Sequence, residues 1–163
     1  TVSHKAILII EIKLPASNNI KLNQHMNYHE VAKQWFVKFG ECCKSRDFES
    51  AKNLVSSDVC SFGTKVELVT NLNDLETQQW QNIWPYIENF EFLVDKLIAD
   101  GNNELIWGVT PWNSIGYDAN GNSFDRPGRA TVILKDFNGV WLAIHTHFSL
   151  IPGTPYNTYG IKE

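Results

Sequence analysis

The sequence predicts a single α+β domain, in which helices come first and pack on one face of a strongly bent antiparallel sheet. Apolar residues recur at helical spacing between residues 27 and 87, whereas apolar and polar residues alternate as in strands after Phe90. Gly108 and Pro111 interrupt a long strand from Leu105 to Tyr117, and the proline indicates either a sheet edge or a bulge, which bends the sheet. A sheet curled around helices commonly leaves a conical pocket.

Capping residues precede three predicted helices: Asn27, Asp47 and Asn73. Asn27 forms a capping box with Glu30, and Asn73 forms one with Glu76. The apolar stripes that follow are Val31, Trp35, Phe39 and Cys42 in the first helix, Phe48, Ala51, Leu54 and Val55 in the second, and Leu75, Trp80, Ile83, Trp84 and Ile87 in the third. Pro85 marks the end of the third helix or a kink in it.

The strands are bounded by turn residues. Residues 59–69 are typical of a strand pair, or of one strand with a kink at Gly63, and residues 90–99 of a single strand. Turns are predicted at residues 118–122, which lead into a loop, and at residues 137–140, which join the strands 129–135 and 141–150 into a hairpin.

Strict alternation divides the last strand into two faces. One face carries Trp141, Ala143, His145, His147 and Ser149, and the other carries Leu142, Ile144, Thr146, Phe148 and Leu150. Neither face is typical of solvent-exposed surface, so the strand is expected to be covered on both sides. A second subunit is the natural cover for the side away from the helices, which predicts a homo-oligomer.

Composition excludes several classes of partner. A net charge of -4 without a basic stripe argues against nucleic acid, and no apolar run approaches the roughly 20 residues that span a bilayer. We therefore expect a cytoplasmic protein with no membrane partner. The three cysteines, Cys42, Cys43 and Cys60, form neither a disulfide framework nor a zinc motif. Residues 1–25, in which Ile10–Leu14 alternates like a strand, are interpreted as an N-terminal extension, and residues 26–163 as the domain.

Several segments together resemble a known family: Arg46–Ser50, Phe62–Thr64, Gln81–Trp84, Arg129–Thr131 and Trp141–Ser149. In this order they look like a SnoaL-like domain of the nuclear transport factor 2-like superfamily. The Trp-x-x-x-His-x-His-x-Ser pattern of the last strand particularly resembles the association (hub) domain of calcium/calmodulin-dependent protein kinase II. The resemblance covers residues 27 to 152.

The resemblance implies a cone-shaped, cystatin-like fold that pairs through its sheet. Members of the family include isomerases, cyclases, dehydratases, ligand-binding proteins and oligomerisation modules, so the fold does not select an activity. The kinase hub has an arginine-lined pocket, but the corresponding positions here are Val132 and Phe148. An arginine-lined anion pocket is therefore not expected. Arg129 is a candidate cation, although it lies three residues from Val132 and faces elsewhere unless a bulge intervenes.

Three residues are candidates for acid–base chemistry. His145 and His147 have the spacing of two metal ligands, but a metal would need a third ligand such as Asp125 or Glu67, and we predict none. The two histidines could instead move a proton or form a structural hydrogen-bonded pair. Asp125 could act as a base in an apolar cone, but the favoured interpretation is a loop pair of Asp125 and Arg126.

The candidate ligand-binding residues are Trp80, Trp84, Trp112, Tyr117, Arg129 and Phe148, most of them aromatic. The favoured function is binding of a small organic ligand in an apolar-aromatic pocket, or assembly, without a cofactor. The alternative is an isomerase, cyclase or dehydratase in which His145, His147 or Asp125 moves a proton, and Arg129 or a tryptophan orients the substrate.

Overall fold

The computed structural model describes residues 26–162, so the strand expected at Ile10–Leu14 lies outside the described residues. The helical layer begins with α1 (Tyr28–Ser45) and α2 (Phe48–Lys52). After the first strand, one composite helix runs through α3 (Leu72–Asp74), a π-helical segment η1 (Leu75–Trp80), α4 (Gln81–Ile83) and a 3₁₀ turn η2 (Trp84–Tyr86). No helix within residues 26–162 is both long and apolar enough to cross a membrane.

The sheet contains seven strands: β1 (Val55–Phe62), β2 (Glu88–Phe92), β3 (Ile98–Gly101), β4 (Leu105–Tyr117), β5 (Ser123–Asp125), β6 (Gly128–Phe137) and β7 (Val140–Leu150). Their order is β1-β7-β6-β4-β2, and β3 and β5 also pair with β4. The strands pair antiparallel except that β1 runs parallel to β7. The predicted α+β architecture is confirmed, with one parallel pairing that alternation patterns cannot reveal.

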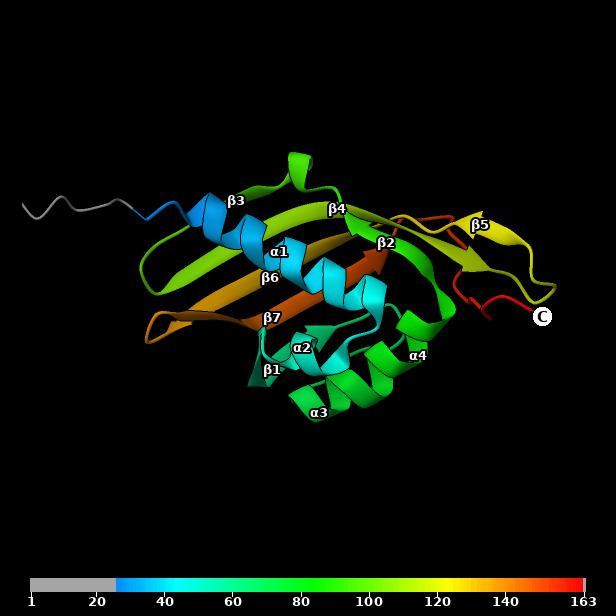
Figure 1. Cartoon of the computed structure of the whole chain (residues 1–163), viewed down its shortest axis with the longest axis horizontal. Helices are drawn as coiled ribbons and strands as arrows, with labels where there is room; N and C mark the ends of the chain where they lie inside the picture. Colours follow the sequence, from blue (N-terminus) through cyan, green and yellow to red (C-terminus); the bar gives the residue numbers. More distant parts are fainter. Residues whose placement is uncertain (1–25, 163) are drawn as a thin grey trace, which may run out of the picture.

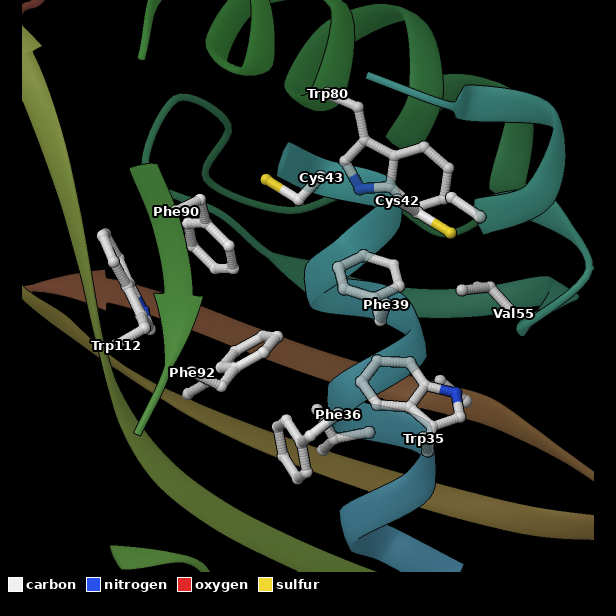
Figure 2. Packing of buried hydrophobic residues seen from close by; sticks show 14 of the residues in the cluster. Trp35, Phe36, Phe39, Cys42, Cys43, Val55, Trp80, Phe90, Phe92 and Trp112 are labelled. Atoms are coloured by element: carbon white, nitrogen blue, oxygen red, sulfur yellow. The ribbon is translucent and has the colours of Figure 1, made fainter. Parts of the chain in front are cut away.

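Helix α1 lies across one face of the sheet (Figure 1). It begins as predicted, because the Asn27 side chain accepts a hydrogen bond from the Glu30 amide at 3.1 Å. Its buried side presents Phe36 to Phe92 of β2 and Phe39 to Trp80 of the composite helix, and Trp35 stacks on Phe39 (Figure 2). Helix α1 therefore holds the core between the helices and the inner face of the sheet.

Two predicted helix boundaries were wrong. The short helix ends at Lys52, so Val55 begins β1 instead of extending the helix. The third helix begins at Leu72, because the Asn71 side chain accepts a hydrogen bond from the Asp74 amide at 2.8 Å. This cap lies two residues before the predicted cap, Asn73, which is also an asparagine and therefore an equally good capping residue by type.

The predicted strand at residues 90–99 is also wrong, because it is divided into β2 and β3 by a 3₁₀ turn, η3 (Val94–Lys96). The division lies opposite Pro111 of β4. The Pro111 carbonyl accepts a hydrogen bond from the Leu93 amide at 2.9 Å, so the backbone of Pro111 faces the segment between β2 and β3. Proline has no N–H to continue that ladder, and the neighbouring strand breaks there.

A bulge at Ile144 changes the faces of β7. In the register with β6, Ile133 pairs with His145 and Leu134 pairs with Ala143, so Ile144 has no partner. Trp141 and Ala143 therefore share the helix-covered face with Thr146, Phe148 and Leu150. The division predicted from strict alternation was wrong, because one extra residue reverses the phase of everything beyond it. His145 and His147 lie on the sheet's other side, called here the open face.

Candidate functional site

A cavity lies between the composite helix and the inner face of the sheet, and we call it the cone. Its volume is about 30 Å³, enough for two or three water molecules at roughly 10–15 Å³ each on this measure. The lining residues come from α1, the end of β1 and its following loop, the composite helix and the sheet: Phe39, Cys43, Ser61, Phe62, Gly63, Thr64, Leu75, Gln79, Trp80, Ile83, Trp84, Ile87, Phe90, Trp112, Arg126, Thr146 and Phe148.

Aromatic rings form one wall of the cone. The Trp80 and Trp84 rings stack with centroids 5.0 Å apart, and Phe39 meets Trp80 edge-on at 5.6 Å. Figure 2 shows Trp80 above Phe39, and Cys43 Sγ directed toward the Phe90 side while Cys42 Sγ points the opposite way. Of the residues predicted to bind a ligand, Trp80, Trp84, Trp112 and Phe148 line this cavity.

The cone also contains one arginine, which is Arg126 and not the predicted Arg129. Arg126 is not a loop partner of Asp125: its amide donates to the Ser114 carbonyl at 2.8 Å, and its carbonyl accepts from the Ser114 amide at 3.1 Å. Backbone pairing with β4 turns both side chains to the inner face, where Arg126 is only 1% exposed. Asp125 is exposed and lies in a separate groove.

Arg126 has little to neutralise its charge. Its Nη2 donates to Thr64 Oγ1 at 3.1 Å, and its guanidinium lies over the Trp112 ring at 5.4 Å from the centroid. Its Nε is buried without an acceptor, and it forms no ion pair with any residue of the described range. Burial lowers the pKa of Arg126 to about 10, so the side chain is still a cation near neutral pH.

Trp112 contributes a second unpaired donor. Its ring is 1% exposed, and within residues 26–162 its buried Nε1 has no hydrogen-bond acceptor. The ring lies so close to the β6 backbone that a Cβ added to Gly128 would be 2.1 Å from Trp112 Cζ2. Only glycine at position 128 allows this packing. The two side chains that carry these buried N–H groups without acceptors, Trp112 and Arg126, line the same cavity.

Gln79 fixes the loop that borders the cone. Its Oε1 accepts from the amides of Lys65 and Val66 at 2.9 and 3.1 Å, and its Nε2 donates to Thr64 Oγ1 at 3.2 Å. Thr64 Oγ1 thereby accepts from both Gln79 and Arg126, which occupies its two lone pairs and leaves its proton to donate. The π-helical segment places Gln79 here, at a kind of helix irregularity that is often found at functional sites.

Five of the predicted site residues lie outside the cone. His145, His147 and Arg129 are on the open face, where Arg129 Nε donates to Ser149 Oγ at 3.1 Å. The Tyr117 hydroxyl donates to Glu88 at 2.7 Å, and this contact raises the pKa of Tyr117. Asp125 is the fifth. The cone lining therefore has no histidine, aspartate or glutamate, and its titratable side chains are Cys43 and Arg126.

The open face carries two rows of side chains that cross the sheet. One row contains Ile98, Val109, Thr131, His147 and Phe62, and the next contains Asp100, Trp107, Ile133, His145 and Cys60. Ile98 is 63% exposed, Trp107 43% and Phe62 40%. The Phe62 ring contacts both imidazoles edge-on, at centroid distances of 5.8 Å to His145 and 5.3 Å to His147.

No three His, Cys, Asp or Glu side chains of the described range converge as metal ligands would. The two candidate third ligands, Asp125 and Glu67, thus do not complete a site with His145 and His147. Burial raises the pKa of the Cys43 thiol well above its usual range, so this cysteine is a neutral group in the cone.

Arg126 is the cone residue that sequence reasoning placed wrongly, and a signal for it existed. It lies six residues before Val132, an even number, so alternation alone assigns both to one face of the strand. The proline at position 127 obscured this signal, because Asp-Arg-Pro is typical of a turn.

The family model of the SnoaL-like domain matches residues 32–153. No curated protein is similar enough in sequence to count as a match. Among solved structures, the chain is similar to a Xanthomonas campestris protein with a proposed assignment as a calcium/calmodulin dependent protein kinase II association domain. The two share 17% identity at a TM-score of 0.64, over 77% of this chain and 88% of the other.

Two further solved structures show the same likeness. A nuclear transport factor 2-like superfamily protein from Salmonella enterica shares 12% identity over 78% of this chain and 94% of its own, with a TM-score of 0.66. A Streptomyces avermitilis protein of the nuclear transport factor 2-like family, with a proposed assignment as a dehydratase, shares 14% identity over 77% of this chain and 97% of its own, with a TM-score of 0.64. These identities show the fold alone, and they confirm the predicted nuclear transport factor 2-like fold.

Proposed function

This chain belongs to the SnoaL-like domain family, and we propose that it binds a small organic molecule in its cone. The observation that carries the proposal is the lining of the cavity, in which stacked indoles face a few buried polar groups. Apolar walls with a small number of placed polar groups are the usual composition of a ligand site. At about 30 Å³ the cavity suits a molecule of a few heavy atoms.

Binding is favoured over acid–base catalysis because of what lines the cavity. The histidines and the aspartate that could move a proton lie on the open face or in another groove, and the thiol of Cys43 is held neutral by burial. A general base must lie within hydrogen-bond reach of the proton that it removes. The isomerase, cyclase or dehydratase alternative therefore has no base in the cone among the residues described.

The experiment compares ligand binding in two neighbouring cysteine variants of the full chain. Cys43→Met extends a side chain into the cone, whereas Cys42→Met makes the same change on a side chain that points away from it (Figure 2). Native mass spectrometry of freshly purified protein reports a retained ligand, and indole fluorescence follows titrations with acetate and acetamide. We expect binding to wild type and to Cys42→Met, and its loss in Cys43→Met. If no ligand is retained and neither probe binds, the proposal is wrong.

We also propose that the chain forms a homo-oligomer through its open face. Ile98 on β3, Trp107 on β4 and Phe62 on β1 are apolar, exposed and placed on the same face of the sheet, with β6 and β7 between β4 and β1. Soluble monomers seldom expose contiguous apolar surface of this kind, and a copy of the same face is self-complementary in a two-fold dimer. Assembly and ligand binding then use opposite sides of one sheet.

A further inference from the structure

We infer that the ligand of the cone is a small carboxylate, and that Arg126 is its counter-ion. This inference rests on the proposed function, because it names the chemistry of the same cavity. The observation that leads to it is that two buried donors, Arg126 Nε and Trp112 Nε1, have no acceptor within residues 26–162. Buried donors are almost always paired in folded proteins, so each such group calls for a partner.

An anion fits this position better than a neutral partner. Arg126 is 1% exposed and has no carboxylate in the cone, and its recorded neutral contacts are the Thr64 hydroxyl and the Trp112 ring. A buried cation without a counter-ion is costly in free energy. Removing one partner of a buried ion pair strongly destabilises a protein for the same reason. A bound anion supplies the charge that the chain itself does not provide.

The shape of the site selects a carboxylate over other anions. A guanidinium presents its N–H groups in a planar fork, which matches the two oxygens of a carboxylate. The space of about 30 Å³ fits such a head group with one or two carbons. Beyond the polar groups, the lining consists of Phe39, Trp80, Trp84 and Phe148, which suit the carbon end of the molecule and do not suit a fully hydrated inorganic ion.

The donors around this position come from three parts of the chain. The strand pairing with Ser114 supplies Arg126, β4 supplies Trp112, and the loop held by Gln79 supplies the Thr64 hydroxyl. Gly128 leaves the space that Trp112 needs, since a Cβ there would meet the indole. The site is thus built by several elements and does not depend on one mobile side chain.

The test is a titration of dialysed wild-type protein with acetate, acetamide and chloride, followed by calorimetry and by thermal unfolding. Acetamide has the shape of acetate without its charge, and chloride has the charge without the fork. We expect acetate to bind with a Kd in the high-micromolar to millimolar range, because so few heavy atoms limit the attainable affinity. Acetamide and chloride should bind at least about tenfold more weakly.

Arg126→Met keeps the length of the side chain and removes its charge. We expect acetate affinity to fall about tenfold or more in this variant, and acetate to stop raising its unfolding temperature. Without acetate, Arg126→Met should unfold at the same temperature as wild type or higher, because it no longer buries an unpaired cation. Trp112→Phe keeps a ring and removes only the N–H, and should weaken acetate several-fold.

The outcomes separate this inference from the proposed function. If acetamide binds as well as acetate and Arg126→Met changes neither, the cone binds small organic molecules but the carboxylate assignment is wrong. If chloride equals acetate, the site takes a bare anion and the assignment is also wrong. If no probe binds and Arg126→Met lowers the unfolding temperature, Arg126 is a structural residue hydrated by water and the carboxylate assignment is wrong; the proposed function also fails if native mass spectrometry finds no retained ligand.

Discussion

Arg126 has an unusual position for an arginine, because the chain buries its charge without burying an opposite one. Surface arginines are stabilised by water, and buried ones are normally paired with a carboxylate. Here the nearest recorded groups are a hydroxyl, an indole ring and the neutral Cys43 thiol. The residue is therefore prepared to attract an anion at the expense of the stability of the empty protein.

The titration of Arg126 leads to a prediction on pH. Burial lowers its pKa to about 10 in the folded chain, below the value of an exposed arginine, so the cost of burying the cation applies at lower pH and is relieved as pH rises through about 10. Acetate affinity should thus be constant from about pH 6 to about pH 9, where acetate is also ionised, and weaken above that. Calorimetry across this range checks it. A fall in acetate affinity between about pH 6 and about pH 9 would show that a group other than Arg126 controls binding.

At the same scale, the sequence revealed the cavity walls more readily than the charge. Trp80, Trp84, Trp112 and Phe148 were identified as lining residues because large aromatic side chains are seldom left outside a core. Tyr117 and Arg129 were assigned to the same set but lie on other surfaces. A side chain's type indicates that it has a partner, whereas its direction depends on a strand register that is fixed by distant residues.

One irregularity explains the wrong faces of the last strand. The bulge at Ile144 adds one residue to β7 and shifts the phase of the residues that follow. The π-helical segment at Leu75–Trp80 did not disturb the predicted stripe, because Trp80, Ile83 and Trp84 are buried as expected. Predictions from periodicity assume a constant phase along an element. They therefore identify the element and its type well, but they assign side chains to the wrong face after an inserted residue. Both α1 and β4 were predicted with the correct type, and so was β7, in which only the faces were wrong.

The bulge at Ile144 gives a prediction for the strand as a whole. Deleting Ile144 removes the extra residue, so Trp141, Ala143, Thr146 and Phe148 can all keep the inner face in a strand that alternates strictly. We expect this variant to keep cooperative unfolding in urea and the aromatic near-ultraviolet circular dichroism signal. Ile144→Ala is the matched control, because it keeps the bulge and removes only a partly buried side chain. A deletion variant that loses cooperative unfolding while Ile144→Ala keeps it would show that the faces depend on the bulge itself.

On the scale of the molecule, the bent sheet separates two surfaces of different character. Its inner face supports the helices and closes the cone, while its open face presents two rows of side chains, each of which contains one of the histidines. His145 and His147, the most conspicuous pair in the sequence, therefore belong with the surface that we propose for assembly. Their imidazoles contact Phe62, which also lines the cone, so the two surfaces meet at the end of β1.

The proposed assembly is tested by a charge placed in the middle of the open face. Trp107→Glu puts a carboxylate where an interface would exclude water, and a buried unpaired charge opposes association. Val37→Glu is the control, since Val37 is 45% exposed on α1, close to the 43% of Trp107, but belongs to the helical side.

Size-exclusion chromatography with light scattering, at micromolar concentrations of the full chain, measures the mass of each variant. We expect an oligomer for wild type and Val37→Glu, and a monomer for Trp107→Glu that still binds acetate, because the cone lies on the other side of the sheet. A wild-type monomer would contradict assembly altogether. An oligomer that survives Trp107→Glu but not Val37→Glu would move the interface to the helices, where subunit contacts would border the composite helix that closes the cone.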